Sequence, residues 1–469
     1  MINLNDLLKA SPGSEIWRKL VMERSENCDL WVSGTVKDAG CARQWGSSLN
    51  SFLGPHWTRV RAFHVVVNLY GLFDFFELGL LQLIQHPAQR LEWFSLQLTP
   101  RTLYNSPDTI DKLNTHPLFS NHSPSLQVFS SNLHFHPTAS WASQLRSLSI
   151  SSTSSLSTPN ILDLVSQLSL LETLTLDQAL CRPTNVPRPS VQSVTLRHLK
   201  QFTMVDYNDS CGLLFEHLHL PKECFLDLKI FLLFSSFRAD PLGVCEGISR
   251  CMAHSPTDST TALQLSINCS YTFILLSNQY PGRVESNLYL KIHVAVDVPQ
   301  NHWGAGFENF FKAMVTCVLN SSSANHEKIA QVKAIELAVK QSAPPLTSAS
   351  DLERLLRSAS GIEKMKATLT TMVMLLSFRL DTPPLLFPAL RELVLIKIVG
   401  YGTMDLAPED STLLTFLDWR RDAGVPIEVL DFSFSPVAGD VNVNWFRGMT
   451  GMKIRWKNEE LGLTKEYIC

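Results

Sequence analysis

The chain contains few charged residues, and neither sign is in excess. Asp, Glu, Lys and Arg make up 18% of its 469 residues, whereas about 25% is usual for soluble domains. The 40 basic and 43 acidic side chains leave a formal net charge of −3 at pH 7. This balance disfavours a strongly basic nucleic-acid-binding protein. The 45% of hydrophobic residues excludes a wholly disordered chain.

The sequence also lacks segments that would direct a chain to or through a membrane. Its first residues show no basic stretch followed by an apolar run, as a secretory signal requires. The most apolar early segment, 69–84, contains Asp74 and Glu77 and is shorter than the roughly 20 residues that span a bilayer. The ten cysteines form no Cys-x-x-Cys pair. We therefore expect a cytoplasmic or nuclear protein with reduced thiols and no membrane partner.

Compact catalytic motifs are missing too. There is no Gly-x-x-x-x-Gly-Lys-Ser/Thr loop, no Gly-x-Ser-x-Gly turn and no His-Glu-x-x-His pair. The sequence therefore predicts no enzyme activity, no cofactor and no metal site. One alternative stays open, a metal-dependent enzyme that uses the region from Cys211 to Cys224 with His217 and His219. Zinc sites more often have Cys-x-x-Cys pairs or histidines one helical turn apart.

What the sequence does contain is a recurring strand pattern. Apolar residues repeat as L-x-x-L-x-L, the strand signature of leucine-rich repeats. The pattern begins at Val60, Leu91, Leu145, Leu171, Leu199, Val332, Leu390 and Ile427, and in part at Leu126, where Ser131 replaces the third apolar residue. Consecutive repeats from Leu145 to Phe225 begin 26, 28 and 26 residues apart, and the spacing stretches elsewhere, to 58 residues from Val332 to Leu390.

The segments between these strands have helical signals. Thr158-Pro159 is typical of a helix start with Thr as the cap, and Ser350 with Glu353 forms a capping box. Gly424 can end a helix. Alternating strands and helices at this period predict an α/β fold, an irregular leucine-rich-repeat solenoid whose curved parallel sheet carries helices on its convex side.

Two features of the array concern its regularity and its extent. Only Asn68 occupies the ninth repeat position, where the usual repeat has an Asn that ties neighbouring turns together, so we expect irregular turns. Residues 1–50 are expected to form an N-terminal helical cap and residues 51–469 the repeat array, with a break near residue 340.

In such strands the apolar positions point into the core and the alternate residues point to the concave face. The alternate residues here are mostly short, uncharged and rich in hydroxyls. They are Trp93, Ser95, Ser147, Ser149, Thr173, Thr175, Asp177, Gln201, Thr203 and Glu336. Small polar groups on a rigid sheet suit recognition of another protein, and Trp93 is the candidate anchor. The alternative is that these side chains are only solvated.

The last alternating segment contains Lys453, Arg455 and Lys457. One interpretation is a basic strip that contacts phosphate. The favoured one is a terminal strand whose charges protect an open sheet edge.

Several segments together resemble the leucine-rich-repeat region of mushroom-type fungal F-box proteins. Near the start, Ile16-Trp17, Leu20, Glu23-Arg24-Ser25 and Leu30-Trp31-Val32 resemble the helix and strand that follow the F-box in that family. Further along, the likeness is carried by residues 124–129, 144–150, 170–177, 220–228, 387–393 and 426–432. It covers residues 15–460.

The resemblance implies the substrate-recognition part of a ubiquitin ligase, in which the F-box binds the adaptor of a cullin complex and the repeats bind the target. No F-box precedes Trp17, so residues 1–50 are expected to be the remnant after a missing F-box. The cullin-ligase adaptor is then a partner only if an F-box lies upstream. We expect a non-enzymatic protein-interaction module with a protein partner on the concave face. A repeat scaffold with no ligase link is the alternative.

Overall fold

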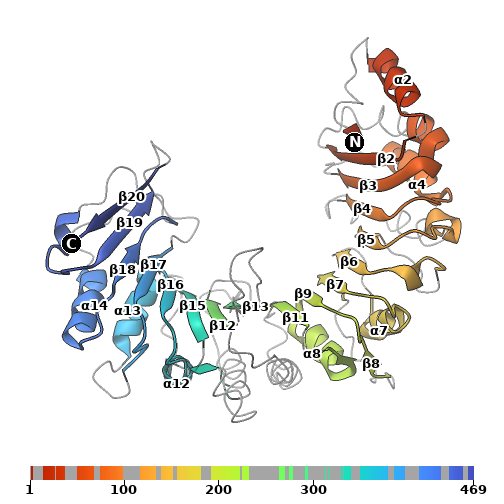
Figure 1. The fold of residues 1–469 in the computed structure, drawn as a ribbon. Coiled ribbons are helices and arrows are strands. Elements are labelled where there is room, and N and C mark those ends of the chain that lie inside the picture. Colours follow the sequence, from red (N-terminus) through yellow and green to blue (C-terminus); the bar gives the residue numbers. More distant parts are fainter. Residues whose placement is uncertain are drawn as a thin grey trace. The chain divides into compact units, whose positions relative to one another are not determined.

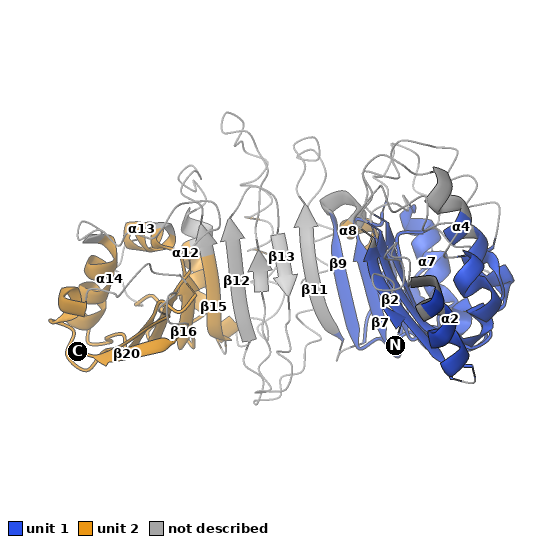
Figure 2. Ribbon diagram, turned by 90° about the horizontal axis from the view of Figure 1, so that it is seen from above, with its two compact units in different colours: residues 1–206, 216–224 blue, residues 207–215, 225–469 orange. Residues whose placement is uncertain are grey.

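Figure 1 shows the fold in a computed structural model of the chain. The structure describes residues 2–3, 14–26, 28–36, 50–67, 74–98, 117–133, 139–151, 156–180, 192–221, 224–231, 263–269, 274–277, 291–293, 312, 316, 329–330, 332–339, 349–378, 385–396, 411–434, 443–457 and 463–469. The chain divides into two compact units (Figure 2): unit 1 comprises residues 1–206 and 216–224, and unit 2 comprises residues 207–215 and 225–469. The expected break near residue 340 borders residues 340–348, which lie outside the described residues, so it stays a prediction.

Unit 1 alternates strands with helices. Its elements are β1 (Ile2–Asn3), α2 (Ser14–Arg24), β2 (Leu30–Val36), η1 (Gly54–Arg59), β3 (Val60–Val67), α4 (Asp74–Gln85), β4 (Trp93–Leu98), η2 (Leu118–Asn121), β5 (Val128–Ser131), η3 (Ala142–Gln144), β6 (Ser147–Ser151), α7 (Thr158–Ser166), β7 (Thr173–Asp177), β8 (Val194–Thr195), β9 (Gln201–Tyr207) and β10 (Leu218–His219). Helix α8 (Asn208–His217) contributes residues to both units.

A parallel sheet of eight strands organises unit 1. Its order is β1-β2-β3-β4-β5-β6-β7-β9, and every neighbouring pair is parallel. Helices α4 and α7 lie on one side of these strands (Figure 2). Parallel strands need crossover connections, and the segments between the apolar runs provide them. The predicted α/β class with a large parallel sheet is therefore confirmed.

The inward side chains of this sheet form aligned rows. Phe63, Phe94 and Phe129 occupy the same register position on β3, β4 and β5 and are fully buried. Their rings stack with centroids 5.7 and 5.5 Å apart. Trp141 extends the stack, 5.3 Å from Phe129. The row continues as Leu148, Leu174 and Phe202. The inward positions of the repeat pattern are thus correctly predicted here.

Buried polar side chains tie the turns of unit 1 together. Asn132 accepts a hydrogen bond of 3.0 Å from the backbone N–H of Leu98 and donates its amide to the carbonyl of the same residue. Ser131 donates to the carbonyl of Leu96 at 2.8 Å, and the carboxylate of Asp206 accepts from the N–H of Leu180 at 2.9 Å. Asn68 lies outside the described residues. Asn132 links neighbouring turns as expected of the repeat Asn, but it lies two positions earlier in its repeat. The link is needed because the buried backbone N–H and carbonyl of Leu98 require hydrogen-bond partners.

Unit 2 repeats the strand and helix alternation after an antiparallel start. Its elements are β11 (Phe225–Phe231), β12 (Leu263–Cys269), β13 (Ile274–Ser277), β14 (Lys291–His293), β15 (Val332–Val339), α12 (Ala349–Ser358), β16 (Lys364–Ala367), α13 (Leu369–Ser377), β17 (Glu392–Leu395), α14 (Ser411–Asp422), β18 (Val429–Asp431), η6 (Val443–Phe446), β19 (Lys453–Lys457) and β20 (Thr464–Ile468). Strands β11, β13 and β14 pair antiparallel. A second sheet has the order β12-β15-β16-β17-β18-β19-β20 and is parallel except for β20.

Strand β16 belongs to a repeat that the L-x-x-L-x-L pattern did not predict. Ile362, Met365 and Ala367 are buried at the three apolar positions and divide the long gap after Val332 into ordinary repeats. Ile, Met and Ala replace the leucines, which is why the repeat escaped notice. Gly361 immediately before it is required, because a Cβ there would collide with the carbonyl oxygen of Ala330.

Three local predictions about helix ends had different outcomes. Helix α7 is capped by Ser157, which accepts from the N–H of Asn160, so the cap lies one residue before the predicted Thr158. The predicted capping box is wrong, because α12 begins at Ala349 and Ser350 lies inside it. Gly424 does follow α14, with φ of +75°, a conformation that glycine adopts without steric cost.

A fully buried arginine closes the turn before β17. The guanidinium of Arg420 in α14 donates to the carbonyls of Leu386, Phe387 and Leu390 at 3.1, 2.8 and 2.8 Å. Burial lowers its pKa to about 10, so the group stays protonated at neutral pH. Phe387 has a left-handed φ of +51°, a conformation unfavourable for a non-glycine residue. The charge-assisted bonds offset that strain.

Candidate functional site: the exposed faces of the two sheets

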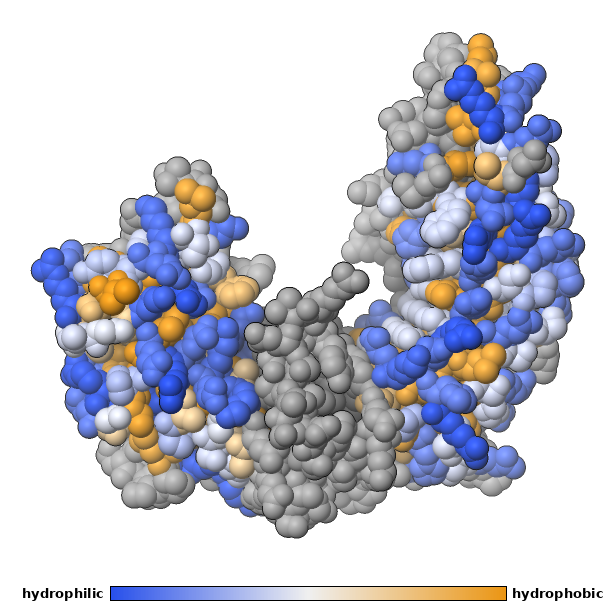
Figure 3. Space-filling model, viewed as in Figure 1, coloured by the Kyte–Doolittle hydropathy of each residue, from blue (hydrophilic) through white to orange (hydrophobic). Residues whose placement is uncertain are grey.

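The register of unit 1 aligns the outward residues into rows. One row runs Trp31, Ala62, Trp93, Val128, Ser147, Thr173, Gln201, and the next runs Ser33, His64, Ser95, Ser130, Ser149, Thr175, Thr203. We call these two rows the hydroxyl face. Apart from the titratable His64, the face contains no ionisable side chain. Figure 3 shows the visible side of unit 1 as a mixture of strongly hydrophilic, near-neutral and apolar residues.

The structure places most of the predicted binding residues on this face. Trp93 is 48% exposed. Ser147, Ser149, Thr173, Thr175 and Thr203 are half-buried, and Asp177 and Gln201 are exposed, with Asp177 at the end of β7 beyond the two rows.

Two predicted residues differ from that pattern. Ser95 has the expected register, opposite His64 of β3 and between Trp93 and Gln97 on β4, but it is only 5% exposed. Glu336 belongs to the sheet of unit 2, where it lies 3.9 Å from Lys366. It is therefore not part of the hydroxyl face.

Sequence reasoning missed Trp31 as a binding residue. It is 50% exposed and lies in the same row as Trp93, with Ala62 of the strand between them. The available signal was its place beside Leu30 and Val32, which are both buried. An aromatic residue between two inward residues points outward by strand alternation.

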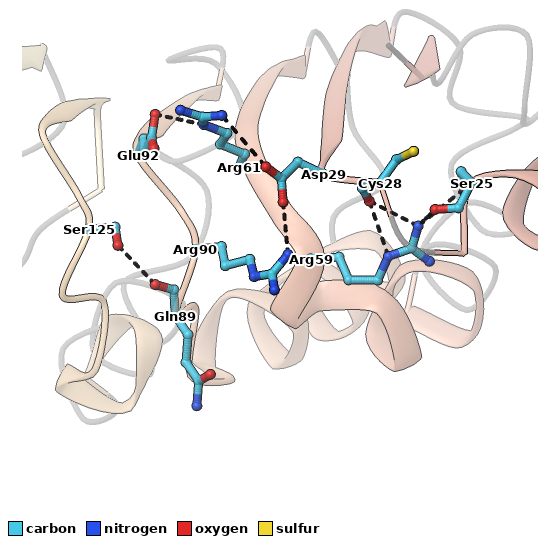
Figure 4. Close-up of polar contacts among 9 residues, drawn as sticks. All are labelled: Ser25, Cys28, Asp29, Arg59, Arg61, Gln89, Arg90, Glu92 and Ser125. Atoms are coloured by element: carbon cyan, nitrogen blue, oxygen red, sulfur yellow. Dashed lines mark hydrogen bonds and ion pairs between the residues drawn. The ribbon is translucent and has the colours of Figure 1, made fainter.

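A ladder of charges marks the start of the strands (Figure 4). Arg61 lies 2.8 Å from Glu92 and 3.6 Å from Asp29, and Asp29 also pairs with Arg90 at 3.0 Å. The same position in later repeats brings Glu172 to 2.6 Å from Arg146 and 2.5 Å from Lys200. Hydrogen bonds from Lys200 and Arg146 lower the pKa of the Glu172 carboxyl.

The backbone explains this regularity. The N–H of Glu92 donates to the carbonyl of Arg61, and the N–H of Lys200 donates to the carbonyl of Glu172, both at 2.8 Å. Residues at the start of one strand are thus held beside their counterparts in the next repeat. Opposite charges at successive counterparts can therefore pair.

Arg59 links the N-terminal helix to the sheet. Its guanidinium donates to the backbone carbonyls of Ser25, just after α2, and Cys28 (Figure 4). His56, one turn earlier in η1, has a lowered pKa, because burial and the positive charge of Arg59 both disfavour its protonation. These contacts fix the strand that carries Trp31.

The corresponding face of unit 2 is charged. Lys364 lies 2.7 Å from Glu392, and Glu466 lies 2.8 Å from Arg455 and 3.5 Å from Lys453. Lys366 lies over the ring of Phe434, with its amine 4.5 Å from the ring centroid. We call this set, with Glu336 and Asp431, the charged face.

The charged face corrects one prediction. Strand β19 was expected to be a terminal edge strand, but it lies between β18 and β20. Its Lys453 and Arg455 pair with Glu466 of β20. The basic residues therefore do not line an open edge.

The alternative metal site gains no cluster in the part of the chain that the structure describes. Cys211 is buried in α8, and His217 ends that helix. Among the described residues, no three His, Cys, Asp or Glu side chains lie close enough together to hold a metal ion.

No protein-family model matches the chain, and no curated protein matches it in sequence. Within the described ranges, no helix has the length and apolar character needed to cross a membrane.

Proposed function

We propose that this chain is a non-enzymatic protein-interaction module, built as an irregular leucine-rich-repeat solenoid, and that the hydroxyl face of unit 1 binds its protein partner. The observation that carries the proposal is the alignment of Trp31 and Trp93 in one row beside rows of Ser and Thr. Exposed tryptophans are frequent anchors of protein interfaces. A sheet face that only contacts water does not require two half-exposed tryptophans in one row.

Desolvation favours this face over the charged one. Burying a hydroxyl that finds a hydrogen-bond partner costs little, whereas burying an ion pair costs more than its attraction often returns. The hydroxyl face can therefore be covered by a partner at a small cost. Such a surface suits recognition rather than chemistry.

The experiment compares three forms of the purified chain as bait in extracts of its source cells. The test variant is Trp93→Ala/Thr173→Ala/Thr175→Ala. The control variant, Asp163→Ala/Gln167→Ala/Leu170→Ala, removes three exposed side chains of the α7 region. We expect the test variant to keep its unfolding midpoint. It should capture at least about tenfold less partner than the unmodified chain. Equal capture by both variants would refute the proposal.

The resemblance to F-box proteins supports a more specific role, the recognition part of a ubiquitin-ligase receptor. Its test is co-purification of the full gene product. Recovery of an adaptor and a cullin supports the receptor role. Recovery of a face-dependent partner without them supports the alternative, a repeat scaffold with no ligase link.

A further inference from the structure

One solvent-accessible position recurs in both units, directly before the first aligned outward residue of each strand. The register aligns this position from repeat to repeat, and the backbone N–H of each later residue donates to the carbonyl of its counterpart at 2.7–2.9 Å. We call it the ladder position. Its residues are Arg61, Glu92, Gln127, Arg146, Glu172 and Lys200 in unit 1 and Lys333, Glu363, Arg391 and Glu428 in unit 2.

The charges at the ladder position alternate in sign. In unit 1, Glu172 lies between Arg146 and Lys200 and pairs with both. In unit 2 the sign changes at every step, and ion pairs join Lys333 to Glu363 and, at 3.5 Å, Arg391 to Glu428. Among these ten residues, no two neighbours carry charges of the same sign.

Gln127 interrupts the alternation in unit 1. Its neighbours at the ladder position are Glu92 and Arg146. A charged side chain at residue 127 would repel one of these two neighbours, whichever its sign. The uncharged amide avoids a like-charge contact on both sides. It therefore separates two alternating blocks, one that ends at Glu92 and one that begins at Arg146.

The core of unit 1 distinguishes the repeats less sharply than these charges do. The equivalent inward positions of β6, β7 and β9 are occupied by Leu148, Leu174 and Phe202, all fully buried. A folding chain that skips β7 and pairs β6 with β9 would still bury apolar residues against apolar residues. The same skip would bring Arg146 beside Lys200, where their charges repel each other.

We propose that the alternating charges specify the order in which the repeats pair, because a pairing that skips one repeat within a block places like charges side by side. In unit 2 the skipped pairings would be Lys333 with Arg391 and Glu363 with Glu428. Wrong pairing between similar units is a characteristic failure of repeat proteins. Exposed ion pairs add little to the finished fold, but the order depends on the difference between an attractive pairing and a repulsive one. This device is independent of the proposed function.

Disulfide trapping during refolding of the full chain tests the proposal. Ser147 and Gln201 occupy equivalent positions of β6 and β9, with Thr173 of β7 between them. Two strand spacings separate them by about 9.6 Å, and a disulfide needs Cα atoms within about 7 Å. The pair Ser147→Cys/Gln201→Cys therefore crosslinks only when β7 is skipped. Ser147→Cys/Thr173→Cys, on neighbouring strands, reports the native pairing, and peptide mapping by mass spectrometry measures both crosslinks.

The test variant adds Lys200→Glu to the skip-reporting pair. This change makes the skipped pairing with Arg146 attractive and the native pairing with Glu172 repulsive. At an ionic strength of about 10 mM we expect at least about threefold more of the skip-reporting crosslink. The excess should disappear near 1 M salt, where the screening length is about 3 Å.

Two matched variants separate the order of charges from the amount of charge. Arg197→Glu makes the same change of net charge at an exposed residue of the same repeat, away from the ladder position, and should leave the crosslink unchanged. Arg146→Glu/Glu172→Lys/Lys200→Glu inverts the whole block but keeps the alternation. Because Gln127 is uncharged, the inverted block gains no like-charge neighbour on that side, and the crosslink should return to the level of the parent ladder.

Equal crosslinking by the Lys200→Glu and Arg197→Glu variants would overturn the proposal. So would an excess that persists at high salt, or an inverted block that crosslinks as much as Lys200→Glu alone. None of these results depends on partner capture, so the proposed function stands or fails separately.

Discussion

The two units use the same strand plan but differ on both sides of their sheets. The inward row of unit 1 is aromatic over β3, β4 and β5, whereas that of unit 2 is aliphatic, with Ile335, Met365 and Leu393 at the equivalent positions. The outward rows of unit 1 are hydroxyls and indoles, and those of unit 2 are ion pairs. The repeat therefore constrains only which positions are apolar, and the alternate positions are available for different functions.

The charged face and the hydroxyl face also differ in how their side chains can contribute to stability. The ion pairs of the charged face are partly exposed, and pairs accessible to solvent contribute about 0–1 kcal/mol each to stability. The stability of unit 2 must come from its core and turns instead. The hydroxyl face contributes little to stability and can serve recognition without loss to the fold.

The largest effect is expected where the cores differ. Phe94→Ala opens a cavity in the stack of Phe63 and Phe129 and should lower the free energy of unfolding of unit 1 by about 3–5 kcal/mol. Hydrogen exchange followed by mass spectrometry should show lost protection in β4 and β5, with β16 to β18 unchanged. Equal loss in both units would show that their cores are not distinct.

Unit 2 has its own sensitive point in Arg420. Arg420→Met leaves the carbonyls of Leu386, Phe387 and Leu390 without donors, and should cost about 2–4 kcal/mol by denaturant unfolding. Arg421→Met, at the exposed neighbouring position, is the control and should change stability by less than about 0.5 kcal/mol. An Arg420→Met variant as stable as the parent protein would contradict the role assigned to the three hydrogen bonds of Arg420.

Two side chains that hydrogen-bond to the backbone of a neighbouring repeat test whether different residues stabilise the turns of the two units. Asn132→Ala removes two bonds to Leu98, and Thr371→Val removes the 3.0 Å bond to the carbonyl of Leu337. Each should destabilise its unit by about 1–3 kcal/mol. Thermal unfolding measures both, and Ser149→Ala, on the hydroxyl face, should shift the midpoint far less.

The smallest effect concerns the charge ladder. The pKa of Glu172 is lowered in the folded state from a reference value of 4.5. Its contribution is therefore fully present above that reference value and is lost as the pH falls through the lowered pKa. Glu172→Gln should be slightly less stable than the parent at pH 7, and the difference should shrink below about pH 4. A difference that grows on acidification would contradict the pairing with Lys200 and Arg146.

Local patterns predicted more of the fold than of the site. The apolar periodicity placed Phe94, Leu148 and Leu174 inside, because strand alternation is a local property. The repeat at Ile362 escaped notice, because Met and Ala at its inward positions are acceptable to the core but weak as a pattern. The cap of α7, Ser157, and the first residue of α12, Ala349, lie within two residues of the predicted positions, and helix ends commonly differ by that much.

The candidate site depended on alignments that no local pattern contains. Trp93 was identified singly, and Trp31 was recognised only as part of a resemblance. Their common row follows from the pairing of β2, β3 and β4. Glu336 looked equivalent to the other outward residues until strand pairing placed it in another sheet.

The sequence by itself determined the alternation of strands and helices, the inward residues and the low charge of the hydroxyl face, because these follow from neighbours along the chain. Only the tertiary structure decided the strand register, the ion-pair ladder, the hydrogen bonds of Asn132 and Asp206 to neighbouring turns, and the common row of Trp31 and Trp93. The physical reason is that register is set by packing between distant segments, and a shift of one residue would turn every outward side chain inward.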